Sequence, residues 1–362
     1  MKSIKMAEII NRAAEEEKEE LSNTIPPSDI VAFNELRSCA DIYRMYTAGQ
    51  LDINPDFQRG EVWSPKEQTL FIDSLIKQLP IPSLCISWDF VANKRLVVDG
   101  LQRISTIIKF LKPTSEWRLS NTNEVDERIA GKTIAQIKEI DNNRLFNLVE
   151  NVTIPITIIR CDYSKKDHMQ YLFQIFSRLN SGGKKLYYQE IRNCVYSGSL
   201  NTLLKNLARC DSWLKYAETE IEKVEKARFS NEERILRFFA FYKNYTSYNG
   251  RLASFLNNYM EDNKDLSEGE IFELNTLFVS VFRILNEISI TSSSRYIDDA
   301  LFVGIANNID KLMLFDLETR KNRIQDVLAL PEFSMDTVSS DTSAKDKVVS
   351  RIQASIDCLS HD

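Results

Sequence analysis

The chain has 362 residues, 43 % of them hydrophobic, and a formal net charge of −6 at pH 7. This length and apolar content suffice for one large two-lobed unit or for two domains. The negative charge argues against electrostatic binding of DNA by the whole molecule, although a local basic groove can exist within an acidic protein.

The histidines and cysteines narrow the chemistry further. Only His168 and His361 occur, too few for an HNH nuclease motif, an HD phosphohydrolase or a histidine-rich zinc site in this chain. A Ser-His-Asp triad would have only His168 available, and we expect that residue to be a surface or capping residue early in a helix. The six cysteines lack CxxC spacing, which indicates buried free thiols.

Apolar runs such as residues 154–159 are far shorter than the roughly 20 residues that cross a bilayer. The amino terminus does not resemble a secretory signal, because it runs directly into a cluster of glutamates. We therefore expect a cytoplasmic protein with no membrane partner.

In chain order, residues 1–28 form a charged amino-terminal arm. A short strand near residues 30–33 and a helix over 36–47 follow. The next helix should run from Pro65 to about residue 78, because a serine, a proline and a glutamate supply its N-cap and capping box.

Strand signals over residues 83–88 and 95–98, joined by a turn-rich VANK sequence, predict a hairpin. The second strand ends at Asp99, and an apolar repeat beyond Gly100 predicts a helix that stops before Pro113. Asp99 should therefore lie at a strand-to-helix turn.

Residues 114–150 are polar and irregular, with helical pieces over 134–148, and residues 152–161 supply another strand. Ser164 is the expected N-cap of a helix through Leu179. From Tyr187 to the end, apolar residues repeat at helical spacing.

The sequence thus predicts an α+β domain with a small mixed sheet over residues 29–190, followed by an all-helical domain over 191–362.

Three polar clusters could carry chemistry. The first, residues 54–60 with Val62 and Trp63, contains an FQRG sequence that could be just a turn. The third, residues 178–185 followed by 189–193, has glycines that could bind phosphate through backbone N–H groups or could merely end a helix.

The second cluster, residues 97–103, places a carboxylate, an amide and a guanidinium where a strand ends and a helix begins. Helix-start amides favour anions, Arg103 could contact a phosphate, and Asp99 could hold Mg²⁺ or orient a water molecule. The alternative is an Asp99–Arg103 pair that only fixes the turn.

Together the clusters resemble the DGQQR family, the amino-terminal domain of GmrSD-type restriction enzymes. The matching segments are PDFQRGEVW, LPIPSLCI, VVDGLQRISTI and FSRLNSGGKKLYYQEIRN, in family order. The resemblance implies a ParB/sulfiredoxin-like core, binding and hydrolysis of nucleoside triphosphates, and sensing of modified DNA in defence against phage. One departure is Leu101, where the family has glutamine; this position could instead point into the core.

The resemblance also assigns site residues. Catalysis would fall to Asp99, Gln102 and Arg103, with Asp99 as the Mg²⁺ ligand. Nucleotide binding would involve Gln58, Arg59, Gly100, Asn180, Ser181, Gly182, Gly183, Gln189, Arg192 and Asn193.

The leading hypothesis is a nucleotide-binding and hydrolysing regulator of a restriction or phage-defence system, acting with DNA and with a separate nuclease or effector protein. An alternative is a non-catalytic nucleic-acid-binding module that contacts DNA through Phe57, Trp63, Lys184 and Lys185. A metal-dependent nuclease is a third hypothesis, although the sequence offers no matching Asp/Glu/Lys cluster.

Overall fold

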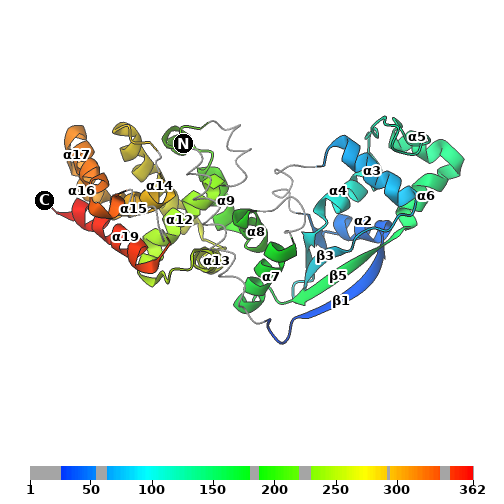
Figure 1. Ribbon diagram of the computed structural model, residues 1–362, viewed down its shortest axis with the longest axis horizontal. Helices are drawn as coiled ribbons and strands as arrows, with labels where there is room; N and C mark the ends of the chain where they lie inside the picture. The colour runs from blue at the N-terminus through cyan, green and yellow to red at the C-terminus, as the bar shows by residue number, and fades with distance from the viewer. Residues whose placement is uncertain are drawn as a thin grey trace. The chain divides into compact units, whose positions relative to one another are not determined.

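The computed structural model describes residues 26–53, 63–179, 187–219, 230–291, 294–334 and 343–361. The chain divides after residue 186 into two compact units. We call the unit of residues 25–186 the sheet unit and the unit that begins at Tyr187 the helical unit (Figure 1). The expected α+β fold followed by helices is confirmed.

The sheet unit contains one mixed five-stranded sheet in the order β1-β5-β3-β4-β2. β1 pairs antiparallel with β5, β3 pairs parallel with β5, and the predicted hairpin is the antiparallel pair β3–β4. The strands are β1 (Val31–Ser38), β2 (Leu51–Asp52), β3 (Leu84–Asp89), β4 (Lys94–Asp99) and β5 (Thr153–Cys161).

Helices cover both faces of this sheet. Alternate strand residues such as Leu84, Ile86 and Val97 pack into the main core together with helices α2 to α6. Helix α7 contacts β4 (Figure 1). The helices are α2 (Cys39–Thr47), α3 (Pro65–Ile76), α4 (Leu101–Leu111), α5 (Ile134–Glu139), the 3-10 helix η3 (Ile140–Asn143), α6 (Arg144–Asn151) and α7 (Lys166–Leu179).

Two predicted boundaries are wrong. The first strand extends to Ser38, and α2 begins only after it, because Ser38 and Asp41 form a capping box there. α7 begins at Lys166, so Ser164 is not its N-cap. The Ser164 hydroxyl instead donates to Asp162 at 2.6 Å, which forms a local turn before the helix.

His168 is buried, with 1 % of its surface exposed, and is not the expected surface residue. Its Nδ1 accepts from the backbone N–H of Asp162 at 3.0 Å, and its Nε2 donates to Asp29 at 2.8 Å. The Lys165 ammonium donates to the same Asp29 carboxylate. His168 therefore fastens the chain before β1 to the start of α7.

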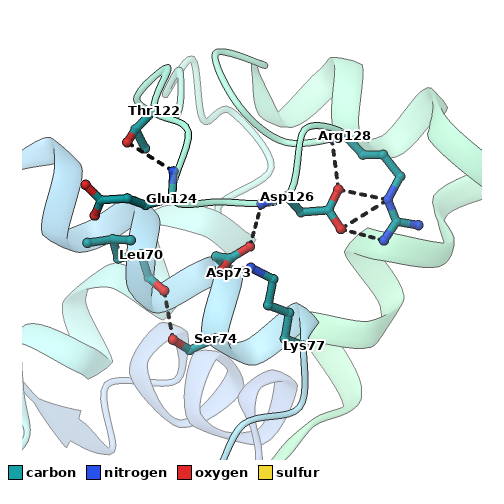
Figure 2. Close-up of polar contacts among 8 residues, drawn as sticks. All are labelled: Leu70, Asp73, Ser74, Lys77, Thr122, Glu124, Asp126 and Arg128. Carbon is teal, nitrogen blue, oxygen red and sulfur yellow. Dashed lines mark hydrogen bonds and ion pairs between the residues drawn. The ribbon is translucent and has the colours of Figure 1, made fainter.

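The irregular excursion before α5 is held on α3 by polar contacts (Figure 2). The buried carboxylate of Asp73 accepts from the backbone N–H of Asp126 at 2.8 Å and from Lys77 at 2.6 Å. Asp126 in turn forms a bidentate ion pair with Arg128, in which Nε donates to Oδ1 and Nη2 donates to Oδ2. The pairs fix a segment that has little regular structure of its own.

The helical unit is built around aromatic side chains. Trp213, Phe278, Phe282 and Phe302 are buried and lie in one chain of ring contacts. Its helices are α8 (Tyr188–Val195), α9 (Ser199–Leu207), α10 (Asp211–Tyr216), α12 (Ser230–Asn244), η5 (Tyr245–Ser247), α13 (Leu252–Asp262), α14 (Glu268–Glu287), α15 (Arg295–Asn307), α16 (Ile309–Leu314), α17 (Leu317–Leu328), η6 (Pro331–Phe333) and α19 (Lys345–Ser360).

Of the helices in the described ranges, none combines the length and the apolar character that crossing a bilayer requires. The six cysteines are free thiols, and four of them, Cys39, Cys85, Cys161 and Cys194, are buried as expected.

Candidate functional site

The turn between β4 and α4 places the second polar cluster at the start of a helix, as the sequence predicts. Gly100 is the N-cap of α4 and has a φ of 95°, a left-handed conformation that favours glycine. A Cβ at this position would collide with the Leu84 side chain and approach Nη2 of Arg103 to 3.1 Å. No side chain caps the helix, so the first-turn N–H groups of α4 have no side-chain acceptor at the N-cap.

Arg103 clamps this turn to the chain that precedes β3. Its guanidinium donates to the carbonyl of Pro82, to the carbonyl of Ser83 at 3.4 Å and to Oδ2 of Asp99 at 3.0 Å. The Arg103 side chain is 13 % exposed, whereas that of Asp99 is 43 % exposed. Asp99 is therefore the more accessible member of the pair.

Burial lowers the pKa of Arg103, and the neighbouring Asp99 carboxylate offsets part of that effect. On the adjacent strand, burial and the charge of Asp99 together raise the pKa of Cys85 to about 12. The Cys85 thiol is therefore protonated at neutral pH and is a poor nucleophile.

Gln102 connects the turn to the chain that follows the FQRG segment. Its Oε1 accepts from the backbone N–H of Trp63 at 3.2 Å. Gln68 donates to the carbonyl of the same Trp63 at 3.1 Å, and Lys109 donates to Gln68 at 2.8 Å. The Lys109 ammonium also lies 4.3 Å from the centre of the Trp117 ring.

Gln68 and Lys109 were not among the predicted site residues. Lys109 had a visible signal, since it is the one charged residue within the apolar run ISTIIKFL. Gln68 had none, because a glutamine on a helix is ordinarily a solvated residue.

Leu101 packs against the apolar core and is half-buried. The residue that departs from the DGQQR pattern thus takes part in packing. Trp63 also packs against the core, with its ring centre 5.4 Å from that of Phe71. The Trp63 ring therefore packs against other side chains of the sheet unit.

Gln189, Arg192 and Asn193 lie on α8 and belong to the helical unit, where all three are buried. Arg192 donates to Asn257 at 2.8 Å and lies 3.3 Å from Glu233, and Gln189 donates to Asn193 at 2.9 Å. Their side chains therefore serve the interior of that unit. Their expected role in nucleotide binding stays a prediction.

The remaining predicted site residues lie outside the described residues. They are Phe57, Gln58 and Arg59 of the first cluster and Asn180, Ser181, Gly182, Gly183, Lys184 and Lys185 of the third.

Asp99 is the residue of the turn that could bind a metal ion. Within the described ranges, no group of three or more His, Cys, Asp or Glu residues gathers as metal ligands do. Asp99 fits Mg²⁺ only as one ligand among several, because Mg²⁺ commonly takes one or two carboxylates and completes its shell with phosphate oxygens and water.

A family model described as the GmrSD restriction endonuclease, N-terminal domain, matches residues 39–197. The segment from α2 to α8 belongs to this family. A search of curated proteins and a search of solved structures found no match.

Membership in the family implies a role in a restriction or phage-defence system. The match contains the Asp99 turn and α8, and β1 lies outside it. The family assignment therefore covers every predicted site residue, whether or not the structure describes it.

Proposed function

We propose that the Asp99 turn binds the phosphate chain of a nucleoside triphosphate and promotes its hydrolysis, and that this reaction regulates a restriction system acting on DNA. The observation that carries the proposal is the start of α4. A helix with no capping side chain begins beside an accessible carboxylate and a guanidinium.

The start of α4 is suited to an anion. Backbone N–H groups of the first turn point out of the helix, and the helix dipole adds a partial positive charge there. Arg103 lies within this first turn and carries its charge in a partly desolvated position. Phosphate oxygens would therefore bind at the N–H groups that follow Gly100 at the start of α4.

Asp99 would act on the reacting end of the nucleotide. Arg103 uses Oδ2 of the carboxylate, and Oδ1 has no partner among the described residues. That oxygen would accept a hydrogen bond from the attacking water and orient it. If Mg²⁺ accompanies the nucleotide, Asp99 would be its protein ligand, and the ion would neutralise charge on the phosphates.

Gln102 has a positioning role in this proposal. Its bond to Trp63 fixes the chain at the end of the FQRG segment, whose Gln58 and Arg59 are the further phosphate ligands expected from sequence. Nucleotide binding at the turn would thus affect the FQRG segment through the hydrogen bond between Gln102 and the Trp63 N–H.

The test is phosphate release by the purified chain with each of the four ribonucleoside triphosphates and Mg²⁺, with and without DNA. Asp99→Asn keeps an acceptor for Arg103 but removes the carboxylate charge, and should lower turnover about 100-fold or more. The matched control is Asp126→Asn, the same change in the same unit at a carboxylate paired with Arg128.

Equal turnover in wild type and Asp99→Asn would contradict the proposal, as would equal losses in Asp99→Asn and Asp126→Asn. The second result would indicate a general loss of folded protein.

A second function is favoured by the contacts of Arg103, whose guanidinium already donates to Asp99 and to the carbonyls of Pro82 and Ser83. On this hypothesis the domain is a non-catalytic module that binds nucleic acid and recruits an effector protein. Its signature would be DNA binding that weakens steeply with salt, no phosphate release from any nucleotide and no effect of nucleotides on DNA affinity.

A further inference from the structure

The helical unit has an exposed apolar groove between α14 and α16. The groove has a volume of about 400 Å³ and is lined from α14 by Phe272, Thr276 and Ser280 and from α16 by Met313, among others. Phe272 is 70 % exposed and Met313 is 48 % exposed. Large apolar side chains that gather around a groove on a protein surface indicate an interaction site.

Charges along α14 indicate what binds there. Glu273 and Arg283 line opposite ends of the groove, ten positions apart on one face of the helix, with the small residues Thr276 and Ser280 between them. Both charged side chains are exposed, and neither has an ion pair among the described residues. This face of α14 therefore carries one charge of each sign, and Asp310 of α16 adds a second carboxylate to the groove.

This arrangement is complementary to itself. If two α14 helices pack antiparallel about a two-fold axis at the level of residue 278, Glu273 of one copy lies opposite Arg283 of the other, and the pair occurs twice. In the same register Thr276 lies opposite Ser280, so small residues meet where the helix axes come closest. The Phe272 side chain of each copy then lies at the groove of the other copy.

We propose that the chain forms a two-fold dimer through α14 and α16, with the groove of each copy covered by the other. The partner is a second copy of this chain because the charge pattern matches its own reversed copy. The interface then has small side chains at its centre, the apolar Phe272 side chains on either side of it and paired charges at its ends. The inference does not depend on the nucleotide chemistry of the sheet unit.

The test is the molar mass of the full chain, without nucleotide, by sedimentation equilibrium over a roughly hundredfold concentration range. Wild type should dimerise. Glu273→Arg and Arg283→Glu should each weaken the dimer roughly tenfold or more, because each places two like-charged pairs at the interface. The double variant with both changes should restore dimerisation.

The matched control is Lys321→Glu, which makes the same change of charge as Arg283→Glu on an exposed position of α17 outside the groove. It should dimerise like wild type. Phe272→Ser should also weaken the dimer, and the folded monomer should tolerate it because this side chain is largely exposed. Circular dichroism of each variant separates a loss of pairing from a loss of fold.

A monomeric wild type over the whole range would overturn the proposal and assign the groove to a different protein. A dimer that neither single charge reversal weakens would also overturn it, since the two copies would then meet elsewhere. A double variant that stays monomeric would exclude the Glu273–Arg283 register and the proposal with it.

Discussion

The two units of this chain differ in how deeply their ion pairs are buried. In the sheet unit the buried core is apolar, and its ion pairs, such as Asp99–Arg103 and Asp73–Lys77, each keep one partner accessible to solvent. In the helical unit whole ion pairs are buried. Arg237 and Asp299 are 4 % and 6 % exposed, and Arg192 is fully buried.

The buried pairs join helices that are distant in sequence. Arg237 of α12 contacts Asp299 of α15 through Nε and Nη2, and Arg234 reaches Asp298 at 2.5 Å. Burial alone would lower the pKa of Arg237, but the Asp299 carboxylate raises it overall. The helical unit therefore depends on the pairing of its buried charges, while the ion pairs of the sheet unit keep a solvent-exposed partner.

The largest expected effect is in the helical unit. Asp299→Ala leaves the buried Arg237 without its carboxylate and should lower the free energy of unfolding by about 3–5 kcal/mol. Hydrogen exchange should locate the loss within residues 230–307. A double variant, Arg237→Met with Asp299→Leu, removes both charges and should regain most of the stability. A loss below about 1 kcal/mol in Asp299→Ala would show that the pair is not truly desolvated.

In the sheet unit, Gly100→Ala should cost about 3 kcal/mol, because alanine is strained at positive φ and its Cβ would collide with Leu84. Gly49→Ala is the matched control. Gly49 also has a positive φ, of 67°, but nothing lies within 4 Å of its Cβ position, so the expected cost is about 1 kcal/mol. Equal costs in urea unfolding would mean that the contact with Leu84 relaxes freely.

Gln102→Ala should have a smaller effect, about 1 kcal/mol, because it removes the acceptor for the Trp63 N–H. Exchange of that N–H with solvent should become faster in the variant. Gln102→Glu keeps an acceptor oxygen and should stay within about 0.5 kcal/mol of wild type. Unchanged exchange at Trp63 in Gln102→Ala would remove the connection between the turn and the FQRG segment.

The smallest effect is a pH dependence in the sheet unit. Arg128 holds the pKa of Asp126 at about 2, below the value near 3.9 expected in the unfolded chain. The pair therefore stabilises fully above about pH 4, and this contribution disappears as the pH falls towards 2. Asp126→Asn should be less stable than wild type by less than about 1 kcal/mol at pH 7, and the difference should vanish near pH 2. A constant difference would contradict the assignment.

Local patterns predicted most of the fold. The capping box at Ser64 and the strand signals around VANK gave the boundaries of α3 and of the β3–β4 hairpin, because both features are encoded within a few residues. β1 was predicted too short, since its residues are exposed and its pairing with β5 involves residues far along the chain. His168 was misplaced for the same reason, as its partner Asp29 is 139 positions away.

The candidate site was predictable at the level of one turn. Asp99, Gly100 and Arg103 lie together because they are adjacent in sequence, and the motif marks them. The partners of the turn, Pro82 and Trp63, could not be inferred because tertiary packing alone brings them there. The buried charges of α12 and α15 also gave no signal, since Arg and Asp on a helix ordinarily face solvent.

The family match and the physical units of the chain do not share a boundary. The match ends at residue 197, whereas the compact units divide after residue 186, so the inherited segment includes α8 of the helical unit. On α8, Arg192 is buried and bonded to Asn257, a residue well beyond the match. A fragment cut at residue 197 would retain Arg192 without that partner. The last helix of the family match is thus packed among helices that lie beyond the match.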